Sequence, residues 1–459
     1  MNQQSSFLAT EPIGKLLVKL AIPTVVAQII NMLYNIVDRI YIGNMAEGSS
    51  LALTGVGITT PIIMIIAAFA ALICYGGAPH ASIAMGGGKH ELANKIMNNC
   101  FVVQVIISII LTISVLIWHK PLLLSFGASE NTIGYASDYI QIYALGTIFV
   151  QITLGMNAFI TAQGFTTISM KTVLIGAILN IILDPIFIFV FDLGVKGAAL
   201  ATIISQFASC VWVILFISGK KSTLKLKKEY IKLDFQLILK CASLGLSPFV
   251  MQSSESVLMV CFNSSLLTYG GDIAVGAMAI LSSVMQMVSL PLQGITQGAQ
   301  PITSYNFGAG NVERVKKVFK LLLTSCTIYS TIIWLIIMLV PASFARLFTN
   351  DVLLIDFTVS ALRIYCFALF GFGILMACQM TFVSIGYAKS SILVAVTRKF
   401  FLLIPAIYIL PHFFENKTSA VYLAEPISDA IAILFSAILF AVQFKKALKK
   451  LENTNLLAK

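Results

Sequence analysis

Long apolar runs separated by short polar clusters dominate the pattern of this 459-residue chain. Seven runs contain no Asp, Glu, Lys or Arg, and each exceeds the roughly 20 residues that a helix needs to cross the hydrocarbon core of a bilayer. They are residues 48–88, 96–119, 139–170, 197–219, 273–312, 321–345 and 364–388. The pattern therefore predicts an all-α integral membrane protein.

Twelve transmembrane helices account for the apolar segments. We expect them near residues 15–43, 51–79, 93–118, 133–162, 168–190, 195–218, 237–267, 274–303, 313–340, 355–384, 391–412 and 419–444. An even number of spans returns the chain to the side on which it starts, so both termini are expected on one side of the membrane.

The composition supports a membrane protein and excludes other classes. Hydrophobic residues make up 58% of the chain and charged residues only 11%, whereas a soluble domain carries about a quarter charged residues. The net charge of +11 does not indicate a nucleic-acid partner, because the basic residues form short clusters between the apolar runs rather than one basic face. The eight Cys are scattered without CxxC spacing, which argues against a disulfide framework or a zinc site.

The placement of Lys and Arg predicts the topology. Alternate connections assign 24 basic residues to one side of the membrane and four, Lys120, Lys196, Arg346 and Lys417, to the other. The larger set is Lys15, Lys19, Lys89, Lys95, Lys171, seven Lys between 220 and 240, Arg314, Lys316, Lys317, Lys320, Lys389, Arg398, Lys399 and five C-terminal Lys. Since cytoplasmic loops carry the excess of Lys and Arg, both termini are predicted to be cytoplasmic.

The chain is an internal repeat with an offset of 222 residues. Residues 75–95 align without a gap with residues 297–317, and seven positions are identical. We therefore expect two pseudo-symmetric six-helix lobes: an N-lobe of residues 1–219, a basic cytoplasmic linker at 220–240 that includes the start of the seventh helix, and a C-lobe at 241–459 with a cytoplasmic tail. Parallel halves of this kind are related by an axis along the membrane normal, with a cavity between them.

The sequence contains neither a nucleotide-binding motif nor a catalytic motif. The segment Gly86 to Lys89 resembles part of a phosphate loop, but the upstream Gly is replaced by Ile83 and the following Ser or Thr by His90. No HExxH, GxSxG or His-rich cluster is present. We therefore expect a transporter driven by an ion gradient, with no cofactor and no enzyme activity.

Asp184 is a strong candidate for function because a carboxylate within the bilayer is costly unless it is paired, hydrated or protonated. Asn180 lies one helical turn before it on the same face, and Pro185 frees a backbone carbonyl. These oxygens would suit Na⁺, whereas burial alone would favour the protonated acid and make Asp184 a proton carrier. The structural alternative is an Asp that caps the kink at Pro185.

Asp38 is the second candidate, near one end of the first helix. Tyr34 and Asn31 lie four and seven residues earlier on the same face, and this aromatic, amide and acid stripe suits an organic cation. Asp38 could instead pair with Arg39 or face water, and the stripe could serve helix packing.

The clearest acid of the second half is Glu255, on the seventh helix, which we expect to line the substrate cavity. Glu425 and Asp429, one turn apart on the last helix, could pair with Arg398 or Lys399 as a structural cluster or could line a polar cavity.

Several segments resemble the multidrug and toxic compound extrusion (MATE) family, and the resemblance covers nearly the whole chain. They are LAIPTVVAQIINMLYNIVDRIYIG, AFITAQGFTTISM, LNIILDPIFIF and GITQGAQPITSYNFGAG, the last of which is similar to the MepA-like bacterial subgroup. The resemblance implies two six-helix lobes that alternate around a central cavity, and export driven by entry of H⁺ or Na⁺.

In relatives with a cation site in the N-lobe, the motif positions correspond here to Asp38, Tyr139, Asn157, Asn180, Asp184 and Thr202. A second branch of the family places a site in the C-lobe, with a Glu on the seventh helix and an Asp on the tenth. Glu255 approximately matches the Glu, but Gly371 and Gln379 fill the interior of the tenth helix. We therefore expect the ion site, including any Na⁺ held by Asp38, Asn180 and Asp184, in the N-lobe, with the C-lobe as its moving counterpart.

The predicted function is a secondary multidrug antiporter that exports small organic cations in exchange for H⁺ or Na⁺. We expect a monomer in the bacterial cytoplasmic membrane, with membrane lipids as its other partners. The alternative is a flippase for lipid-linked sugars or another amphiphile. A flippase would show a cavity rich in cationic residues, whereas the charges that the sequence places within the membrane are mainly acidic.

Overall fold

The computed structural model describes residues 7–45, 49–230 and 232–457, and within these ranges all regular structure is helical. The first six residues and Lys459, which we assigned to the cytoplasmic side, lie outside the described residues. The all-α fold that the hydropathy pattern predicts is confirmed.

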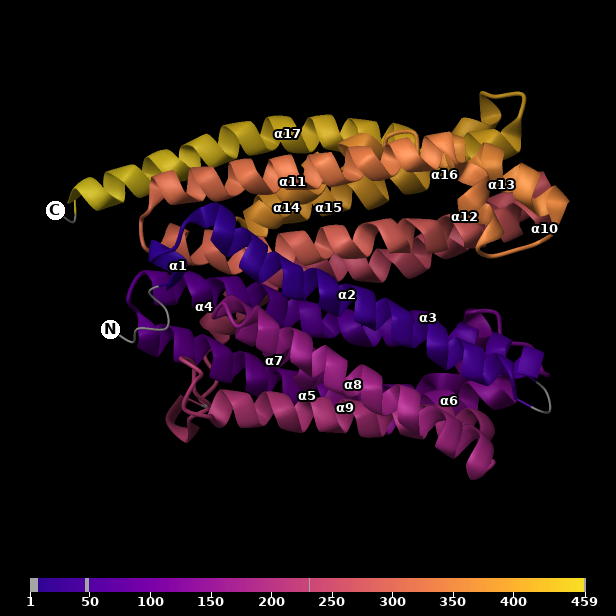
Figure 1. Ribbon diagram of the computed structural model, residues 1–459, viewed down its shortest axis with the longest axis horizontal. Coiled ribbons are helices and arrows are strands. Elements are labelled where there is room, and N and C mark those ends of the chain that lie inside the picture. Colours follow the sequence, from indigo (N-terminus) through magenta and orange to yellow (C-terminus); the bar gives the residue numbers. More distant parts are fainter. Residues whose placement is uncertain (1–6, 46–48, 231, 458–459) are drawn as a thin grey trace.

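The helices form two bundles that lie side by side (Figure 1). The N-lobe contains α1 (Phe7–Thr10), α2 (Ile13–Gly43), α3 (Ser49–Ala70), η1 (Ala71–Tyr75), α4 (Gly76–Gly86), α5 (His90–Ser125), α6 (Ile133–Leu145), α7 (Thr147–Ala162), α8 (Thr166–Pro185), η2 (Ile186–Val190) and α9 (Gly194–Ser218). After the short η3 (Lys228–Tyr230), the C-lobe contains α10 (Phe235–Gly308), α11 (Val312–Leu339), α12 (Pro341–Arg346), α13 (Val352–Tyr365), α14 (Leu369–Ser384), α15 (Ala388–Val396), η4 (Thr397–Leu403), α16 (Ile404–Ile409), η5 (Leu410–His412) and α17 (Lys417–Leu457).

Three breaks interrupt the membrane-spanning helices. In the described ranges, nine continuous helical segments are long and apolar enough to cross a membrane. Two pairs, α6 with α7 and α13 with α14, also meet these criteria when each pair is taken as one span, despite bends of 57° and 50°. The 74 residues of α10 form two helices joined at Gly271, whose φ of 65° and ψ of −163° are not helical. With α10 counted twice, the described residues contain the twelve expected spans.

Two spans that we predicted as continuous are therefore bent. The break between α6 and α7 falls at Gly146, where an added Cβ would lie 2.5 Å from Cγ1 of Ile203 on α9. This close approach gives a packing reason for glycine at the bend, which the hydropathy pattern does not reveal. Three further spans contain the π-helical segments η1, η2 and η4.

The linker between the lobes is bound to the N-lobe rather than free in solvent. The Gln163 side-chain oxygen accepts hydrogen bonds from the backbone N–H of Thr223, at 2.8 Å, and of Leu224, at 3.1 Å. On α5, the side-chain oxygens of Asn94, Asn98 and Asn99 accept from the backbone N–H of Lys225, Lys227 and Asp234. These side chains therefore hold the backbone of the linker against the N-lobe, while the Lys side chains of the linker, apart from Lys225, are exposed.

Polar contacts between the lobes gather at the end of the molecule where α1 begins and α17 ends (Figure 1). Thr24 on α2 donates to the Gly294 carbonyl of α10 at 2.6 Å, and Gln28 donates to Gln297 at 3.1 Å. Arg314 donates to the carbonyl of Glu11 at 2.8 Å. The lobes are therefore joined at the end that carries the termini.

The repeated glycine segments form the centre of this junction. A Cβ on Gly86 would overlap the carbonyl oxygen of Tyr305, and a Cβ on Gly308, the position equivalent to Gly86 in the repeat, would overlap the carbonyl oxygen of Ile83. The repeat therefore lets α4 and the end of α10 approach backbone to backbone across the pseudo-symmetry axis.

Replacing Gly308 with Ala should open this junction, because a rigid carbonyl cannot move away as a flexible side chain would. We expect a cysteine introduced at Ser82, which is fully buried, to react several-fold faster with a maleimide when Gly308→Ala is present. Gly57→Ala is the matched control, since a Cβ at Gly57 meets nothing within 4 Å. Equal reactivity in both variants would show that the junction tolerates the added methyl group.

Candidate functional site

Two carboxyl groups meet where α2 packs against α8 in the N-lobe. The side chains of Asp38 and Asp184 lie within reach of a shared hydrogen bond. Asn180, one turn before Asp184, donates from its side-chain nitrogen to Oδ1 of Asp184 at 3.1 Å. The predicted helical pair of amide and acid therefore lies beside the acid predicted on the first span.

Three buried oxygen atoms of this cluster have no hydrogen-bond partner among the described residues: Oδ1 of Asp38, Oδ1 of Asn180 and Oδ2 of Asp184. Buried polar atoms are normally paired, so orphaned acceptors of this kind mark a place for a missing proton or cation. Directly after Asp184, the helix changes at Pro185 into the π-helical segment η2. Segments of this type are frequent at functional sites.

The aromatic and hydroxyl residues of the predicted site lie around Asp38. Tyr139, which is 4% exposed, lies near Asp38 with its hydroxyl next to that of Thr202. Thr202 donates to the Ala198 carbonyl of its own helix at 3.0 Å. Tyr34 also lies close to Asp38, and Asn31 is half-buried on the same helix.

Asn157 lies apart from this cluster. Its side-chain nitrogen donates to the carbonyl of Ser169 at 3.4 Å, near the start of α8. Asn180 lies 11 residues further along that helix, which is a rise of roughly 16 Å. The structure thus brings together Asp38, Tyr139, Asn180, Asp184 and Thr202 and leaves Asn157 nearer the end that carries the termini.

The pairing of Asp38 with Arg39 that the sequence allows does not occur within 4 Å in the described part of the chain. The Arg39 side chain is exposed, and Asp38 is half-buried against Asp184. A simple surface ion pair therefore does not account for Asp38.

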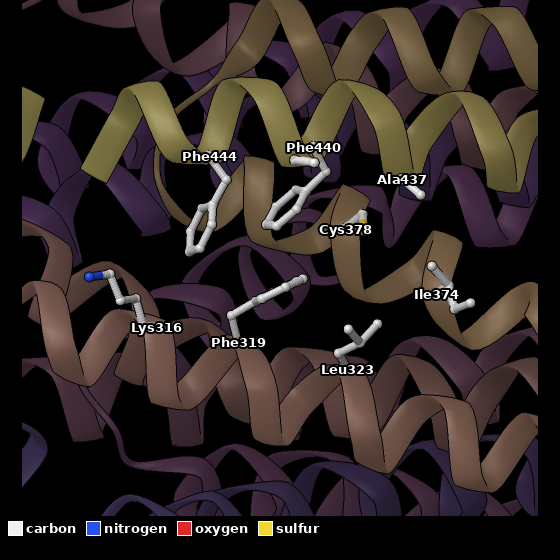
Figure 2. Close-up of a pocket in the computed structure, with 9 residues that line it drawn as sticks. Lys316, Phe319, Leu323, Ile374, Cys378, Ala437, Phe440 and Phe444 are labelled. Atoms are coloured by element: carbon white, nitrogen blue, oxygen red, sulfur yellow. The ribbon is translucent and has the colours of Figure 1, made fainter. Parts of the chain in front are cut away.

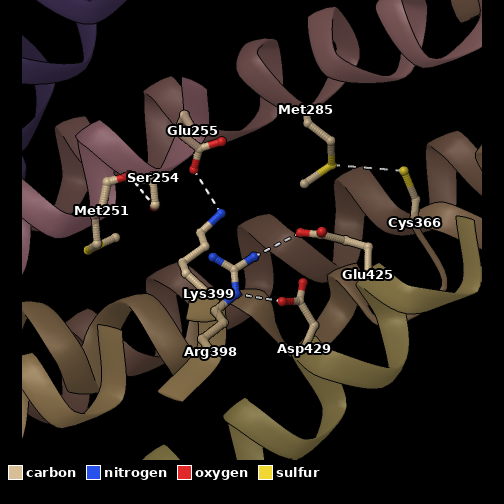
Figure 3. A network of polar contacts seen from close by, with 9 residues as sticks. All are labelled: Met251, Ser254, Glu255, Met285, Cys366, Arg398, Lys399, Glu425 and Asp429. Carbon is tan, nitrogen blue, oxygen red and sulfur yellow. Dashed lines mark hydrogen bonds and ion pairs between the residues drawn. The ribbon is translucent and has the colours of Figure 1, made fainter. Parts of the chain in front are cut away.

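The C-lobe contains a second charged cluster, which Figure 3 shows. Arg398 binds Glu425 at 3.0 Å and Asp429 at 2.6 Å, and these side chains are 6–8% exposed. The guanidinium also lies over the Phe372 ring, 5.2 Å from its centroid. Of the two interpretations of Glu425 and Asp429, pairing with Arg398 is the one that the structure shows.

Our assignment of Arg398 and Lys399 to a cytoplasmic connection is wrong. Both residues belong to η4, in the middle of the span from Ala388 to His412, and both are buried. Lys399 donates to Oε1 of Glu255 at 2.8 Å, and this bond supplies the partner that the sequence did not indicate. Two bases therefore lie among three acids in this cluster, and the charges within the membrane stay mainly acidic, as the sequence predicts.

The sequence was sufficient to place Arg398 and Lys399 within a membrane span. Arg398 and Lys399 fall inside the predicted helix 391–412, so their position in an apolar span was visible. The positive-inside rule, applied to every Lys and Arg, assigned these two residues to a cytoplasmic connection instead. Lys399 and Glu255 are 144 residues apart, so no local sequence pattern indicates that they pair.

A cavity of about 410 Å³ lies between α11, α14 and α17 of the C-lobe (Figure 2). Its lining is almost entirely apolar, with Phe319, Phe440 and Phe444 in contact with one another. Lys316, the charged group that the described residues contribute to the lining, is paired with Glu313 and Glu452. This cavity contains neither charged cluster, and we do not assign it to the site.

Comparison with known proteins identifies the family. The MatE family model matches residues 23–186 and 248–409, once in each lobe. The Multidrug export protein MepA of Staphylococcus haemolyticus (strain JCSC1435) is 25% identical over 415 residues, which cover 90% of each chain. The protein of the same name from Staphylococcus aureus (strain N315) is 23% identical over 411 residues, covering 89% of this chain and 90% of its own.

Solved structures show the same fold. A MATE crystal structure in the bent conformation superposes with a TM-score of 0.91 and 22% identity, covering 98% of this chain and all of its own. An outward-facing multidrug resistance MATE transporter gives a TM-score of 0.90 with 23% identity, over 97% and 99% of the two chains. Because the family model spans most of both lobes, this chain belongs to the MATE family, whose members are membrane transporters rather than enzymes.

Proposed function

We propose that this protein is a secondary multidrug exporter that exchanges small organic cations for H⁺ or Na⁺ by alternating access. The observation that carries the proposal is the pair Asp38 and Asp184, adjacent within the membrane and with orphaned oxygens. Two adjacent carboxylates in a medium of low dielectric constant repel each other, so the site favours the uptake of one positive charge. The names of the MepA relatives support export of several drugs.

Competition for this charge site would couple the two flows. H⁺ or Na⁺ entering the site neutralises the carboxylates and displaces a bound cationic substrate, whereas the empty, charged site attracts the substrate. Binding biases the two states of the transporter only through differential affinity. One charge that moves down 100 mV supplies about 2.3 kcal/mol, so voltage drives the exchange only if more ions enter than cations leave.

The junction between the lobes, at the end that carries the termini, indicates which side of the transporter is closed once the orientation in the membrane is assigned. Without Arg398 and Lys399, 22 basic residues still favour the side with the termini, against four on the other. We therefore propose cytoplasmic termini, in the cytoplasmic membrane of a bacterium. The lobes are then joined on the cytoplasmic side, as expected of a state that opens outward, and a single chain supplies both lobes of a monomeric transporter.

The flippase alternative predicts a cavity dominated by basic residues that bind phosphate. The two charged clusters together contain five acids, Asp38, Asp184, Glu255, Glu425 and Asp429, against the two bases Arg398 and Lys399. Both bases are already bound to carboxylates. This charge balance favours a cationic substrate.

Vesicles that contain the purified protein and are loaded with ethidium would test the proposal. A Na⁺ gradient and a pH gradient are imposed in separate experiments. We expect one of the two to drive ethidium efflux, and that gradient identifies the coupling ion. Efflux under neither gradient, combined with movement of a fluorescent lipid between the leaflets, would replace the exporter with the flippase.

A further inference from the structure

The two lobes place their charged pairs on equivalent helices. In the N-lobe, Asp38 of the first span faces Asp184 of the fifth. In the C-lobe, Glu255 of the seventh span binds Lys399 of the eleventh. Where the N-lobe uses a second carboxyl group, the C-lobe therefore uses an ammonium group.

Both members of the C-lobe pair are shifted by a similar number of residues, and in the same direction, relative to their N-lobe counterparts. With the 222-residue offset, Lys399 corresponds to Ala177, seven residues before Asp184. With Pro23 matched to Pro248, Glu255 corresponds to Ile30, eight residues before Asp38. The C-lobe pair thus lies about two helical turns nearer the end that carries the termini.

The charge of the C-lobe network is not balanced. Arg398 is shared by Glu425 and Asp429, which leaves that cluster with one excess negative charge when all three groups are ionised. Glu255 and Lys399 neutralise each other. With all five groups ionised, the network carries a net charge of −1, which one monovalent cation would balance.

The geometry gives Lys399 two possible partners. Its ammonium group lies between the Glu255 carboxylate and the guanidinium of Arg398, and it is within electrostatic range of Glu425 (Figure 3). The Lys399 side chain is 5% exposed, whereas that of Glu255 is 55% exposed. Glu255 therefore lies at the border of the network, and a cation from the protein itself already lies on its carboxylate.

We propose that Lys399 is a specificity-determining residue: its ammonium group is a tethered cation that occupies Glu255 and moves toward Glu425 when a cationic substrate binds to Glu255. The incoming charge brings the network to neutrality, and the displaced ammonium compensates the excess charge beside Arg398. This inference rests on the proposed export of cations. It assigns Lys399 the role of a competitor, which weakens binding and eases release of the substrate.

Equilibrium binding of ethidium to the purified protein tests this role independently of any driving ion. We expect Lys399→Met to lower the dissociation constant about three- to tenfold, the scale of a partly exposed ion pair that no longer has to be broken. Lys399→Gln should act in the same direction, and Lys399→Arg should bind like the wild type. Lys95→Met is the matched control, because it removes the same charge from an exposed pair with Glu91.

A Glu255→Gln background separates competition from a general electrostatic effect. Because the tethered cation then has no carboxylate to block, adding Lys399→Met should leave the dissociation constant unchanged. The inference is overturned if Lys399→Met binds ethidium no more tightly than the wild type, or if the gain persists in the Glu255→Gln background. Wild-type export with no Lys399 effect would refute the inference alone, whereas absence of ethidium binding in every variant would refute the exporter as well.

Discussion

Asp184→Asn is expected to reduce ion-driven ethidium efflux by at least about 100-fold, which corresponds to roughly 2.7 kcal/mol of lost driving interaction. Asn has nearly the same shape as Asp and can keep a hydrogen bond with Asn180, which now lies 3.1 Å from Asp184. It carries no charge and cannot exchange a proton, so Asp38 would be left without a coupled carboxyl group. The measurement is efflux from vesicles under an imposed gradient.

Asp272→Asn is the matched control for this experiment. Asp272 is an exposed acid next to the break in α10, and the same isosteric change there should leave efflux within a factor of two of the wild type. Vesicle insertion and the elution profile in detergent should be unchanged for both variants. Efflux by Asp184→Asn at the wild-type rate would remove Asp184 from the coupling site.

Part of the candidate site in the N-lobe was predictable, because two of its residues lie close together in the sequence. Asn180 and Asp184 are four residues apart on a helix, so their contact follows from helical geometry alone. The contact between Asp38 and Asp184 joins residues 146 positions apart, and only the resemblance to the MATE family indicated it. The spacing of Asn157 does not reveal its depth, since depth depends on how α7 packs against α8.

In the charged cluster of the C-lobe, the pairing of Arg398 with Glu425 and Asp429 was one of the alternatives that the sequence offered, whereas the pairing of Lys399 with Glu255 was not predictable. A basic residue is compatible with a cytoplasmic loop and equally with a span in which carboxylates neutralise it, and the sequence alone does not show which carboxylates are in reach. Arg398 and Lys399 find theirs on α17 and α10. The C-lobe thus contains a charged network of its own, on helices equivalent to those of the candidate site in the N-lobe.

The twelve spans were predictable, but their interruptions were not. Hydropathy averages over about 20 residues and does not register a single bend or π-helical turn. Two of the π-helical segments lie next to charge: η2 follows Asp184 and Pro185, and η4 carries Arg398 and Lys399. The departures from regular helix thus lie where the charged groups are held.

Arg398→Met should destabilise the folded protein by about 3–5 kcal/mol, because it leaves Glu425 and Asp429 buried without a counter-charge. Their side chains are only 6% exposed, so water cannot take the place of the guanidinium. We expect the midpoint of thermal unfolding in detergent to fall by several degrees. Lys95→Met, which breaks an exposed pair, should lie within about 0.5 kcal/mol of the wild type.

Removing the whole cluster separates the cost of an unpaired charge from the loss of packing. In Arg398→Met combined with Glu425→Leu and Asp429→Leu, no buried charge remains in the triad, and most of the stability should return, since apolar residues often replace a buried ion network without loss. An Arg398→Met variant as stable as the wild type would mean that the two carboxyl groups take up a proton and need no guanidinium. A triple variant no more stable than Arg398→Met would show instead that Arg398 acts through its packing on Phe372.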